Sequence, residues 1–422
     1  MKRTILLLLT ILFMLSSVSC TRKPKESAHE ANTPIVSKQE EKNKVELTLE
    51  QKINGDNGEN SGIFAVKNTN GADTGFEKLV DLMDSQGLSF YRTSLRPDGL
   101  IGKEDVVLLK FNCQWAQRGG TNTDLIKSVI DVITKHPEKF EGEIIIADNG
   151  QAQYGSKRKG GSVEWEENNA IDISQSVKKV ADTFLNNYKV SAMTWDDITT
   201  KEVKDYNQGD YEDGFIVSSE RAATGICISY PKFKTRYGTY VSFKDGIWNE
   251  EQKKYNKGKL KVINMPILKS HMTFNVTASI KNYMGTVSDK LTDHTSHTSV
   301  GVGGMGTQMA GTRMPVLNIL DAIWINPRPN KGPSTSYASA VETNIITAST
   351  DPAALDYWAS KYILMAAAKE LNFEKYQTMD PDGEQPGSFG YWLRKSMEEI
   401  KKSGFKTTID EKKINTYIHI LN

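Results

Sequence analysis

Five short aliphatic runs, each followed at once by polar or turn-forming residues, constrain the fold of this chain more than any other feature. They cover residues 106–111, 143–147, 226–229, 260–264 and 344–348. Continuous runs rich in β-branched residues are typical of parallel strands that are covered on both faces. Helical patterns lie between several of these runs. The sequence therefore predicts an α/β fold with a mainly parallel sheet and helices on both faces, in one large domain that could be two-lobed.

Three segments carry apolar residues at helical spacing: 124–135, 172–185 and the segment that follows Asp351. Thr123 is the predicted N-cap of the first helix. Asp351 is the predicted cap of the third, because Pro352 behind it suits the first helical position. These helices are the expected connections between the strands.

The first twenty residues have the pattern of an export signal. Lys2 and Arg3 precede a mostly apolar run at 5–15, and small residues then lead to Cys20. The apolar run is too short to remain as a membrane-spanning helix. The segment resembles a bacterial lipoprotein signal, in which Cys20 becomes the lipidated N-terminus, although Ser17 stands where leucine is commonest. An ordinary secretory signal is the alternative. Both predict export, and the first predicts a lipid-anchored protein of the cell envelope.

The segment from Thr21 to about Ser61 is polar, lacks aromatic residues and is predicted to be a flexible tether. One folded unit over 62–422 is expected to follow it. Lys and Arg number 53 against 52 Asp and Glu, a net charge of +1. No overall field would therefore attract nucleic acid. The expected partners are a membrane, reached through the N-terminal lipid, and a small-molecule ligand.

Cysteine usage limits the cofactors. With Cys20 assigned to lipidation, Cys113 and Cys227 cannot supply a four-thiolate zinc or iron–sulfur site within one chain. They could form a disulfide in an oxidising compartment, but two separate buried thiols are the favoured interpretation. Cys113 as a nucleophile paired with His271 is conceivable because both follow predicted strands, but nothing in the sequence indicates a lowered thiol pKa.

Ionisable and amide side chains follow the predicted strands. In open α/β sheets, ligands bind beyond the carboxyl ends of the strands, so these groups would converge if the strands are neighbours. Lysines and a histidine there favour an anionic ligand, and the carboxylates could act as a base or as metal ligands. Any one of these residues alone is more often an ordinary polar residue. The group consists of Lys110, Asn112, Asp148, Asn149, Lys232, Lys234, Lys269, His271 and Asp351.

Ordered motifs connect this pattern with a known family. They are Leu-Leu-Lys-Phe-Asn at 108–112, Ile-Ile-Ala-Asp at 145–148, the Lys-x-His element at 269–271, Lys-Asn-x-x-Gly at 281–285 and Asp-Pro-Ala-Ala-Leu-Asp at 351–356. Over roughly 103–364 the chain resembles the family catalogued as domain of unknown function 362. That family has no settled activity, and some relatives carry iron–sulfur modules that are absent here, so no iron–sulfur cluster is expected.

The resemblance implies that Lys269, His271, Lys281 and Asn282 belong to the site. A helix over about 273–283 would carry the last two residues. The alternative is that Asn282 is a helix cap and Lys281 a solvated charge.

His294 and His297 are three residues apart and could share a divalent metal on one helical turn, with a carboxylate from Asp289, Asp293 or Asp321. Polar loop residues are the alternative, because two histidines fall far short of a ligand set.

The Gly-x-Gly-x-x-Gly spacing at 301–306 follows no apolar strand, which argues against a dinucleotide site. A mobile loop that closes over a ligand is the expected structure instead.

The leading functional hypothesis is an exported enzyme for a small anionic or polar substrate. Lys110, Asn112, Lys269, Lys281 and Asn282 would bind the substrate, and His271 or Asp148 would move protons. The alternative is a lipoprotein that binds a ligand without catalysis, using aromatic residues such as Trp115, Tyr154 and Trp165. Whether the protein is an enzyme is left open at this point.

Overall fold

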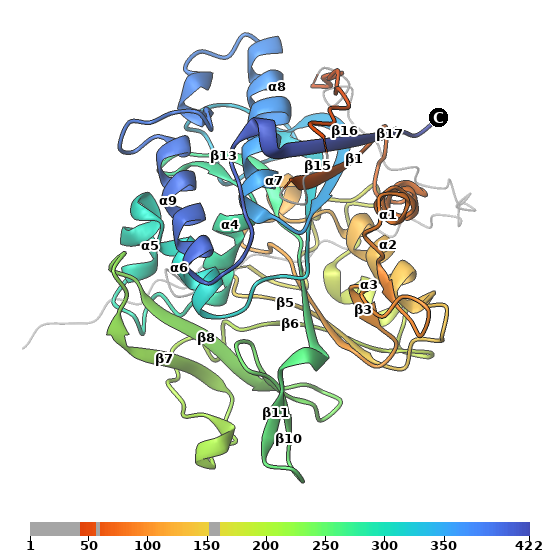
Figure 1. Cartoon of the computed structure of the whole chain (residues 1–422), viewed down its shortest axis with the longest axis vertical. Helices are drawn as coiled ribbons and strands as arrows, with labels where there is room; N and C mark the ends of the chain where they lie inside the picture. The colour runs from red at the N-terminus through yellow and green to blue at the C-terminus, as the bar shows by residue number, and fades with distance from the viewer. Residues whose placement is uncertain (1–42, 56–59, 152–160) are drawn as a thin grey trace, which may run out of the picture. The chain divides into compact units, whose positions relative to one another are not determined.

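A ten-stranded sheet forms the centre of the computed structural model, which describes residues 43–55, 60–151 and 161–422. The strand order is β17-β1-β16-β15-β12-β4-β5-β6, with β13 paired to β15 and β14 paired to β13 (Figure 1). The strands are β1 (Ser61–Lys67), β4 (Val106–Lys110), β5 (Glu143–Asp148), β6 (Lys189–Thr194), β12 (Leu260–Asn264), β13 (Ile267–His271), β14 (Asn275–Thr277), β15 (Leu317–Asn326), β16 (Val341–Ser349) and β17 (Ile414–Ile420).

Strands β15, β12, β4, β5 and β6 are parallel neighbours, whereas β16 runs antiparallel to β15 and to β1. The predicted α/β class is therefore confirmed, but the sheet is mixed. The run at 344–348 lies in this antiparallel strand. Asp351 follows this strand but is not one of the converging residues, because its Oδ2 atom accepts from Ser61 Oγ at 2.6 Å and from the Thr408 N–H at 2.9 Å.

A second sheet, which the sequence did not predict, is antiparallel throughout. Its order is β11-β10-β9-β8-β7, built from β7 (Gly214–Arg221), β8 (Cys227–Lys234), β9 (Tyr240–Ser242), β10 (Gly246–Asn249) and β11 (Lys254–Asn256). The run at 226–229 thus continues as β8 instead of ending before Lys232 and Lys234. Lys232 is buried, donates to the Asp210 carbonyl at 2.6 Å and lies 4.4 Å from the Tyr206 ring. Both lysines are structural parts of this sheet and not site residues. Strands β2 (Tyr91–Arg92) and β3 (Ile101–Gly102) form a separate parallel pair.

Helices cover both faces of the main sheet (Figure 1). One face packs against α1 (Gly75–Ser85), α2 (Thr123–Thr134) and α3 (Val177–Asp182). The other packs against α4 (Ser279–Asn282), α6 (Gly304–Gly311), α7 (Pro352–Ala359), α9 (Phe389–Lys402) and the second sheet. Along β4, Val107 and Leu109 belong to the first core and Leu108 to the second, because successive side chains of a strand point to opposite faces. Two further short helices are α5 (Thr295–Ser299) and α8 (Met365–Glu370).

Side-chain caps fix the helix starts. Asn122, and not the predicted Thr123, caps α2 by accepting from the backbone N–H groups of Asp124 and Leu125. Asp351 caps α7 as predicted, accepting from the N–H groups of Ala353 and Ala354. The predicted helix over 172–185 is shorter than expected, since α3 begins only after its Ser176 cap.

The predicted tether extends too far along the chain. The described residues belong to one unit, which spans Lys38–Asn422. Val45 and Leu47 are buried in the core, and the Val45 N–H donates to the Glu342 carbonyl at 2.9 Å. Most of the predicted tether, the signal segment and Cys20 lie outside the described residues.

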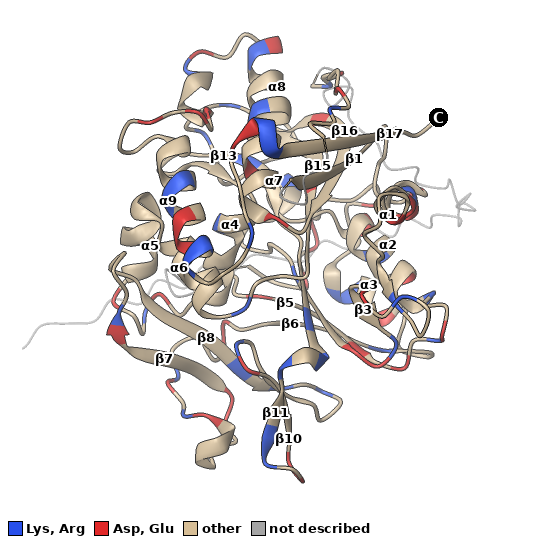
Figure 2. Cartoon of the chain, in the orientation of Figure 1, with Lys and Arg blue, Asp and Glu red and all other residues tan. Residues whose placement is uncertain are grey.

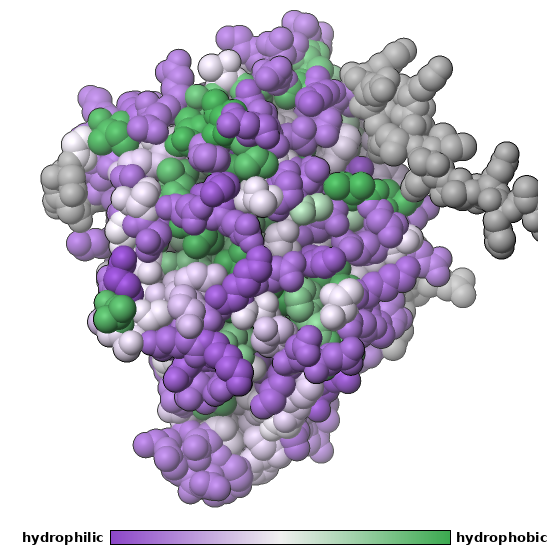
Figure 3. All heavy atoms as spheres, turned by 90° about the vertical axis from the view of Figure 1, so that its right-hand side faces the viewer, coloured by the Kyte–Doolittle hydropathy of each residue, from purple (hydrophilic) through white to green (hydrophobic). Residues whose placement is uncertain are grey.

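Charged residues of both signs alternate over the outer helices, as on α9 (Figure 2). On the face seen in Figure 3, hydrophilic residues predominate and hydrophobic ones form separate patches. None of the described helices combines the length and the apolarity needed to cross a membrane.

Candidate functional site

The strand register brings the predicted site residues to one edge of the sheet. Lys110 at the end of β4 lies beside Asn264 at the end of β12 and beside Ala147 in β5. Strand β15 is ten residues long: its start pairs with β12 and its end pairs with β13, where Lys269 lies opposite Asn326. Lys269 is therefore carried beyond the end of β12. This geometry is the convergence that the sequence predicted for Lys110, Asp148 and Lys269.

Lys110 and Asp148 form a buried ion pair beneath the site. Their Nζ and Oδ1 atoms are 2.6 Å apart, and neither side chain has appreciable exposure. Asp148 Oδ2 also accepts from the Cys113 N–H at 2.9 Å. Burial raises the pKa of Asp148, although Lys110 opposes this effect. Removing one partner of such a pair leaves an uncompensated buried charge, at a cost of about 3–5 kcal/mol. We assign the pair to support of the site, and not to the catalytic role predicted for Asp148.

Gly285 of the Lys-Asn-x-x-Gly motif lies directly against this ion pair. A Cβ atom at this position would lie 2.0 Å from Asp148 Oδ1 and 2.6 Å from Lys110 Nζ. The Gly285 carbonyl accepts from the Asn149 N–H at 3.1 Å. The glycine therefore permits the backbone to cover the ion pair. Any larger residue would clash there, which explains the glycine of the motif.

A buried chain of asparagine side chains joins α4 to the strand ends. Asn282 donates to Asn264 Oδ1 at 2.9 Å, and Asn264 donates to Asn318 Oδ1 at 2.9 Å. Asn112 donates to Asn282 Oδ1 at 3.3 Å. These contacts tie Asn282, and with it the neighbouring Lys281, to the strand ends.

Helix α4 is much shorter than the predicted helix over 273–283. Strand β14 occupies the first part of that segment, and α4 begins only at Ser279. Asp356 of α7 holds the start of α4, since its carboxylate accepts from the N–H groups of Ser279 and Ile280 at 2.7 and 2.9 Å. Burial raises the pKa of Asp356 to about 7. This capping contact joins the motif at 351–356 to the one at 281–285.

A small inner pocket of about 10 Å³, room for about one water molecule, lies above the ion pair. Two of its polar atoms, Asn112 Oδ1 and Thr277 Oγ1, are buried without a hydrogen-bond partner among the described residues. A water molecule or another polar group in the pocket would give these atoms a partner. The inner pocket is lined by Asn112, Gln114, Asp148, Asn149, Gln151, Lys269, Thr277, Lys281, Asn282, Met284, Gly285 and Pro333.

An outer bowl of about 560 Å³ adjoins the inner pocket and shares Gln114, Gln151 and Lys281 with it. Gln114 donates to Gln151 Oε1 at 2.8 Å. The bowl is lined by Gln114, Gln151, His271, Thr273, Phe274, Lys281, His297 and Thr298. A cavity of about 630 Å³ at the opposite edge of the sheet is lined by Arg92, Glu138, Lys259 and neighbouring residues and contains no histidine.

Lys269 and Lys281 are buried cations with few compensating contacts. Lys269 donates to the Gly119 carbonyl at 2.5 Å. Burial, with the charge of Lys281, lowers the pKa of Lys269 to about 7. Burial lowers the pKa of Lys281 to about 8, and its Nζ lies 5.3 Å from the centre of the Phe274 ring. No carboxylate among the described residues forms an ion pair with either ammonium group. The pocket is therefore electropositive.

His271 is held as a neutral hydrogen-bond donor. Its Nδ1 atom accepts from the N–H groups of Thr273 and Phe274 at 3.1 and 3.2 Å. The proton of the neutral ring must then be on Nε2. Burial, with the charges of Lys281 and Lys269, lowers the pKa of His271 far below its usual value. For this reason His271 is poorly suited to the proton transfer that the sequence suggested for it.

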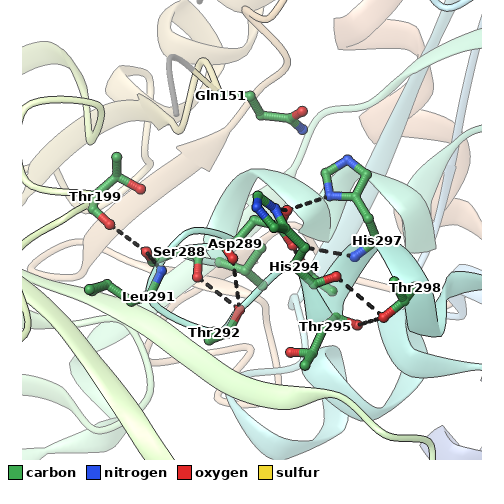
Figure 4. Close-up of polar contacts among 12 residues, drawn as sticks. Gln151, Thr199, Ser288, Asp289, Leu291, Thr292, His294, Thr295, His297 and Thr298 are labelled. Atoms are coloured by element: carbon green, nitrogen blue, oxygen red, sulfur yellow. Dashed lines mark hydrogen bonds and ion pairs between the residues drawn. The ribbon is translucent and has the colours of Figure 1, made fainter. Parts of the chain in front are cut away.

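A second histidine has the features of a base. The Nδ1 atoms of His294 and His297 lie 2.8 and 2.9 Å from the same oxygen of Asp289 (Figure 4). Asp289 is buried, and burial would raise the pKa of its carboxyl, but His297 and His294 outweigh burial and lower it. An ionised Asp289 holds the proton of neutral His297 on Nδ1, which leaves the lone pair on Nε2. His297 lines the bowl, which places its imidazole at the site.

Of the three carboxylates proposed to complete a metal site, Asp289 contacts both histidines, whereas Asp293 and Asp321 are engaged elsewhere. Asp293 is largely exposed and lies 3.7 Å from Arg221. Asp321 accepts from the N–H groups of Asn122 and Ile323 at 2.8 and 3.0 Å. Within residues 43–55, 60–151 and 161–422, no three His, Cys, Asp or Glu side chains are arranged to hold a metal ion. The predicted metal at His294 and His297 stays a prediction.

The glycine-rich segment at 301–306 is not a loop. It forms a short turn and the first residues of α6, and Gly304, Met305 and Gly306 are buried. A Cβ atom on Gly306 would lie 2.2 Å from the Ser396 carbonyl oxygen in α9. The glycines allow two helices to approach closely, so the predicted mobile lid is wrong.

Cys113 and Cys227 are unpaired thiols, as the favoured interpretation had it, although Cys227 is only partly buried. Burial, with the charge of Asp148, raises the pKa of the Cys113 thiol well above its usual value. Cys113 is therefore not an activated nucleophile.

The fold and the site together define an α/β protein with an electropositive pocket at the carboxyl ends of its parallel strands. Residues 260–361 match the family model described as a domain of unknown function (DUF362). This segment contains β12, β13, α4 and α7 and confirms the family that the sequence motifs suggested. Neither the curated proteins nor the solved structures include a match to the chain.

Several site residues were missed by sequence reasoning. Gln114 and Gln151 follow β4 and β5 by only a few residues, which is a signal that could have identified them. Asn264 ends β12 as Lys110 ends β4. No sequence signal pointed to Thr277, whose role depends on the pairing of β14 with β13.

Proposed function

We propose that this protein is an enzyme that transfers protons on a small anionic substrate bound in the outer bowl. The observation that carries the proposal is the placement of the Asp289-oriented His297 in the same bowl as the buried Lys281. The cationic lysines attract the anion. His271 offers an N–H donor, the glutamine amides offer polar contacts, and His297 Nε2 accepts or returns the proton.

The test begins with ligand binding. Calorimetry with acetate, pyruvate, malate and phosphate should identify the anion that the purified protein binds. Lys281→Gln should weaken its binding about 10-fold to 100-fold, because a hydrogen bond to a charged group contributes about 1.5–3 kcal/mol. Lys78→Gln, at an exposed lysine on α1, is the control and should leave binding unchanged.

Proton transfer is then followed by NMR as deuterium incorporation into the bound anion in heavy water. His297→Gln should abolish incorporation and retain binding, because glutamine cannot exchange a proton in this way. Equal incorporation by wild type and His297→Gln would overturn the role of His297.

The alternative function is ligand binding without catalysis. Trp115 and Trp165 do not line the bowl, so aromatic capture of a sugar has little support, and Tyr154 lies outside the described residues. A ligand recovered unchanged and without deuterium would favour this alternative.

We also propose that the protein is exported and anchored through a lipid on Cys20 in the bacterial cell envelope. The support is the charged start, apolar run and small residues that precede Cys20. A small diffusible anion is a suitable substrate for a domain in that location.

A further inference from the structure

We propose that Lys281 is an amine nucleophile and that the substrate is a 2-oxo acid, which the enzyme binds as an imine. This inference rests on the function proposed above and adds the substrate class. It follows from which lysine a substrate can reach, from what surrounds that lysine, and from the space beside it.

Of the three lysines at the site, only Lys281 lines the outer bowl. Lys110 is covered by Asp148 and by the backbone at Gly285. Lys269 lines the inner pocket, which has room for about one water molecule and none for a carboxylic acid. Among the described lysines, Lys281 is therefore the one whose amine a carbonyl carbon in the bowl can meet.

The surroundings of Lys281 raise the fraction of uncharged amine above that of an exposed lysine. The side chain is buried beside the Phe274 ring, and no carboxylate among the described residues pairs with it. Burial lowers its pKa to about 8, so roughly one molecule in ten has a neutral amine at pH 7. A lysine desolvated near another cationic group, here Lys269, is the usual arrangement of an amine nucleophile.

The chemistry balances without an oxidant or reductant. The amine nitrogen attacks the carbonyl carbon, and the carbonyl oxygen takes a proton to give a carbinolamine. Loss of one nitrogen proton and departure of the hydroxyl group with a second proton give the protonated imine and one water molecule. Loss of the remaining nitrogen proton gives the neutral imine. His297 can receive and return these protons. The inner pocket beside Lys281 has the size of the water that is released.

The carboxylate of the substrate also finds partners in the bowl. His271 presents its Nε2–H, and Gln114 and Gln151 present amide groups. The positive charge of Lys269 lies behind them. A carboxylate next to a carbonyl therefore satisfies the site better than an aldehyde or ketone without charge.

Trapping with borohydride tests the inference. The purified protein is mixed with pyruvate and sodium borohydride, which reduces an imine to a stable amine, and is then examined by intact mass and peptide mapping. The expected result is one adduct per chain, on Lys281. Absence of an adduct, or labelling spread over exposed lysines as in urea-denatured protein, would overturn the proposal.

Lys281→Arg separates this inference from the proposed function, because arginine keeps the charge and cannot form the imine. The variant should bind pyruvate within about 10-fold of wild type, a difference of about 1.4 kcal/mol, and give no adduct. If wild type binds pyruvate but is never trapped, the imine is wrong and anion binding stands. If wild type binds none of the anions, both proposals fail. Should the variant not fold, the mapped adduct of wild type still decides the matter.

Discussion

Three lysines at the site share one side-chain chemistry and differ in role because their surroundings differ. Lys110 has a carboxylate at 2.6 Å and completes an ion pair. Lys269 has only a carbonyl contact, and Lys281 has an aromatic neighbour. An ammonium group buried without a carboxylate costs free energy, and that cost appears as a lowered pKa. The two lysines with lowered pKa are those that adjoin open space, which is the arrangement expected of a functional site.

The free energy of unfolding should depend on pH because the pKa of Lys269 is lowered in the folded state. The pKa is about 7 in the folded state against 10.5 for an ordinary lysine, so between these values the unfolded chain keeps a proton that the folded chain has lost. The free energy of unfolding that depends on Lys269 should therefore rise as the pH goes from about 7 to 10.5, by about 1.4 kcal/mol for each unit of pKa shift. Below pH 7 the full cost of the buried charge should remain.

Urea unfolding of wild type and Lys269→Met across this pH range measures the effect. The difference in unfolding free energy between the two proteins should change in favour of wild type as the pH rises. The same comparison with Lys78→Met should stay flat, since Lys78 is exposed. A flat difference for Lys269→Met as well would show that Lys269 titrates as an ordinary lysine.

At the scale of elements, the site depends on contacts between strands and helices that are far apart in the sequence. The length of β15 decides that β13 carries Lys269 past the edge of the sheet. Asp356 of α7 caps α4, and α4 positions Lys281. Helices α5 and α6 bring His297 to the bowl, and α6 is held in turn by its close packing against α9.

The packing of α6 on α9 gives a prediction about a glycine. Gly306→Val should lower the stability by about 1–3 kcal/mol, because the new side chain would meet the Ser396 backbone. The melting temperature should fall by several degrees, and thermolysin should then cut within residues 299–311, which wild type should resist. Gly301→Val is the matched control, since no atom lies within 4 Å of a Cβ there. Cleavage of wild type in this segment would contradict the packed helix.

At the scale of the whole molecule, one mixed sheet separates two hydrophobic cores. Helices α1, α2 and α3 close one core, while the remaining helices and the antiparallel sheet close the other. The site lies at the carboxyl edge of the parallel strands, where helix and loop backbones from several parts of the chain converge. The proposed export signal precedes this unit in the sequence and is tested separately.

Lipidation of Cys20 can be measured directly. Expression of the full chain in a bacterium supplied with labelled palmitate should yield a labelled protein in the membrane fraction, because the acylated cysteine anchors the chain. Cys20→Ser should remove the label, and Cys227→Ser should not. Release of unlabelled wild type into the soluble exported fraction would instead favour an ordinary secretory signal.

Local sequence determined those features that depend on a few adjacent residues. The aliphatic runs at β4, β5 and β12 gave strands, and Asp351 with Pro352 gave a helix start, because strand formation and capping are local effects. The meeting of Lys110 and Asp148 also followed, since the parallel strands β4 and β5 end at one edge, whereas Lys269 reaches them on β13.

Only the tertiary structure decided the roles of these residues. Asp351 is bound by Ser61 and Thr408 and lines neither pocket, and Lys232 belongs to the second sheet. Whether Asp148 is a base or half of an ion pair, and whether His271 or His297 can move a proton, depends on burial and on partners far along the chain. Those contacts exist only once the chain has folded, so spacing in the sequence could not reveal them.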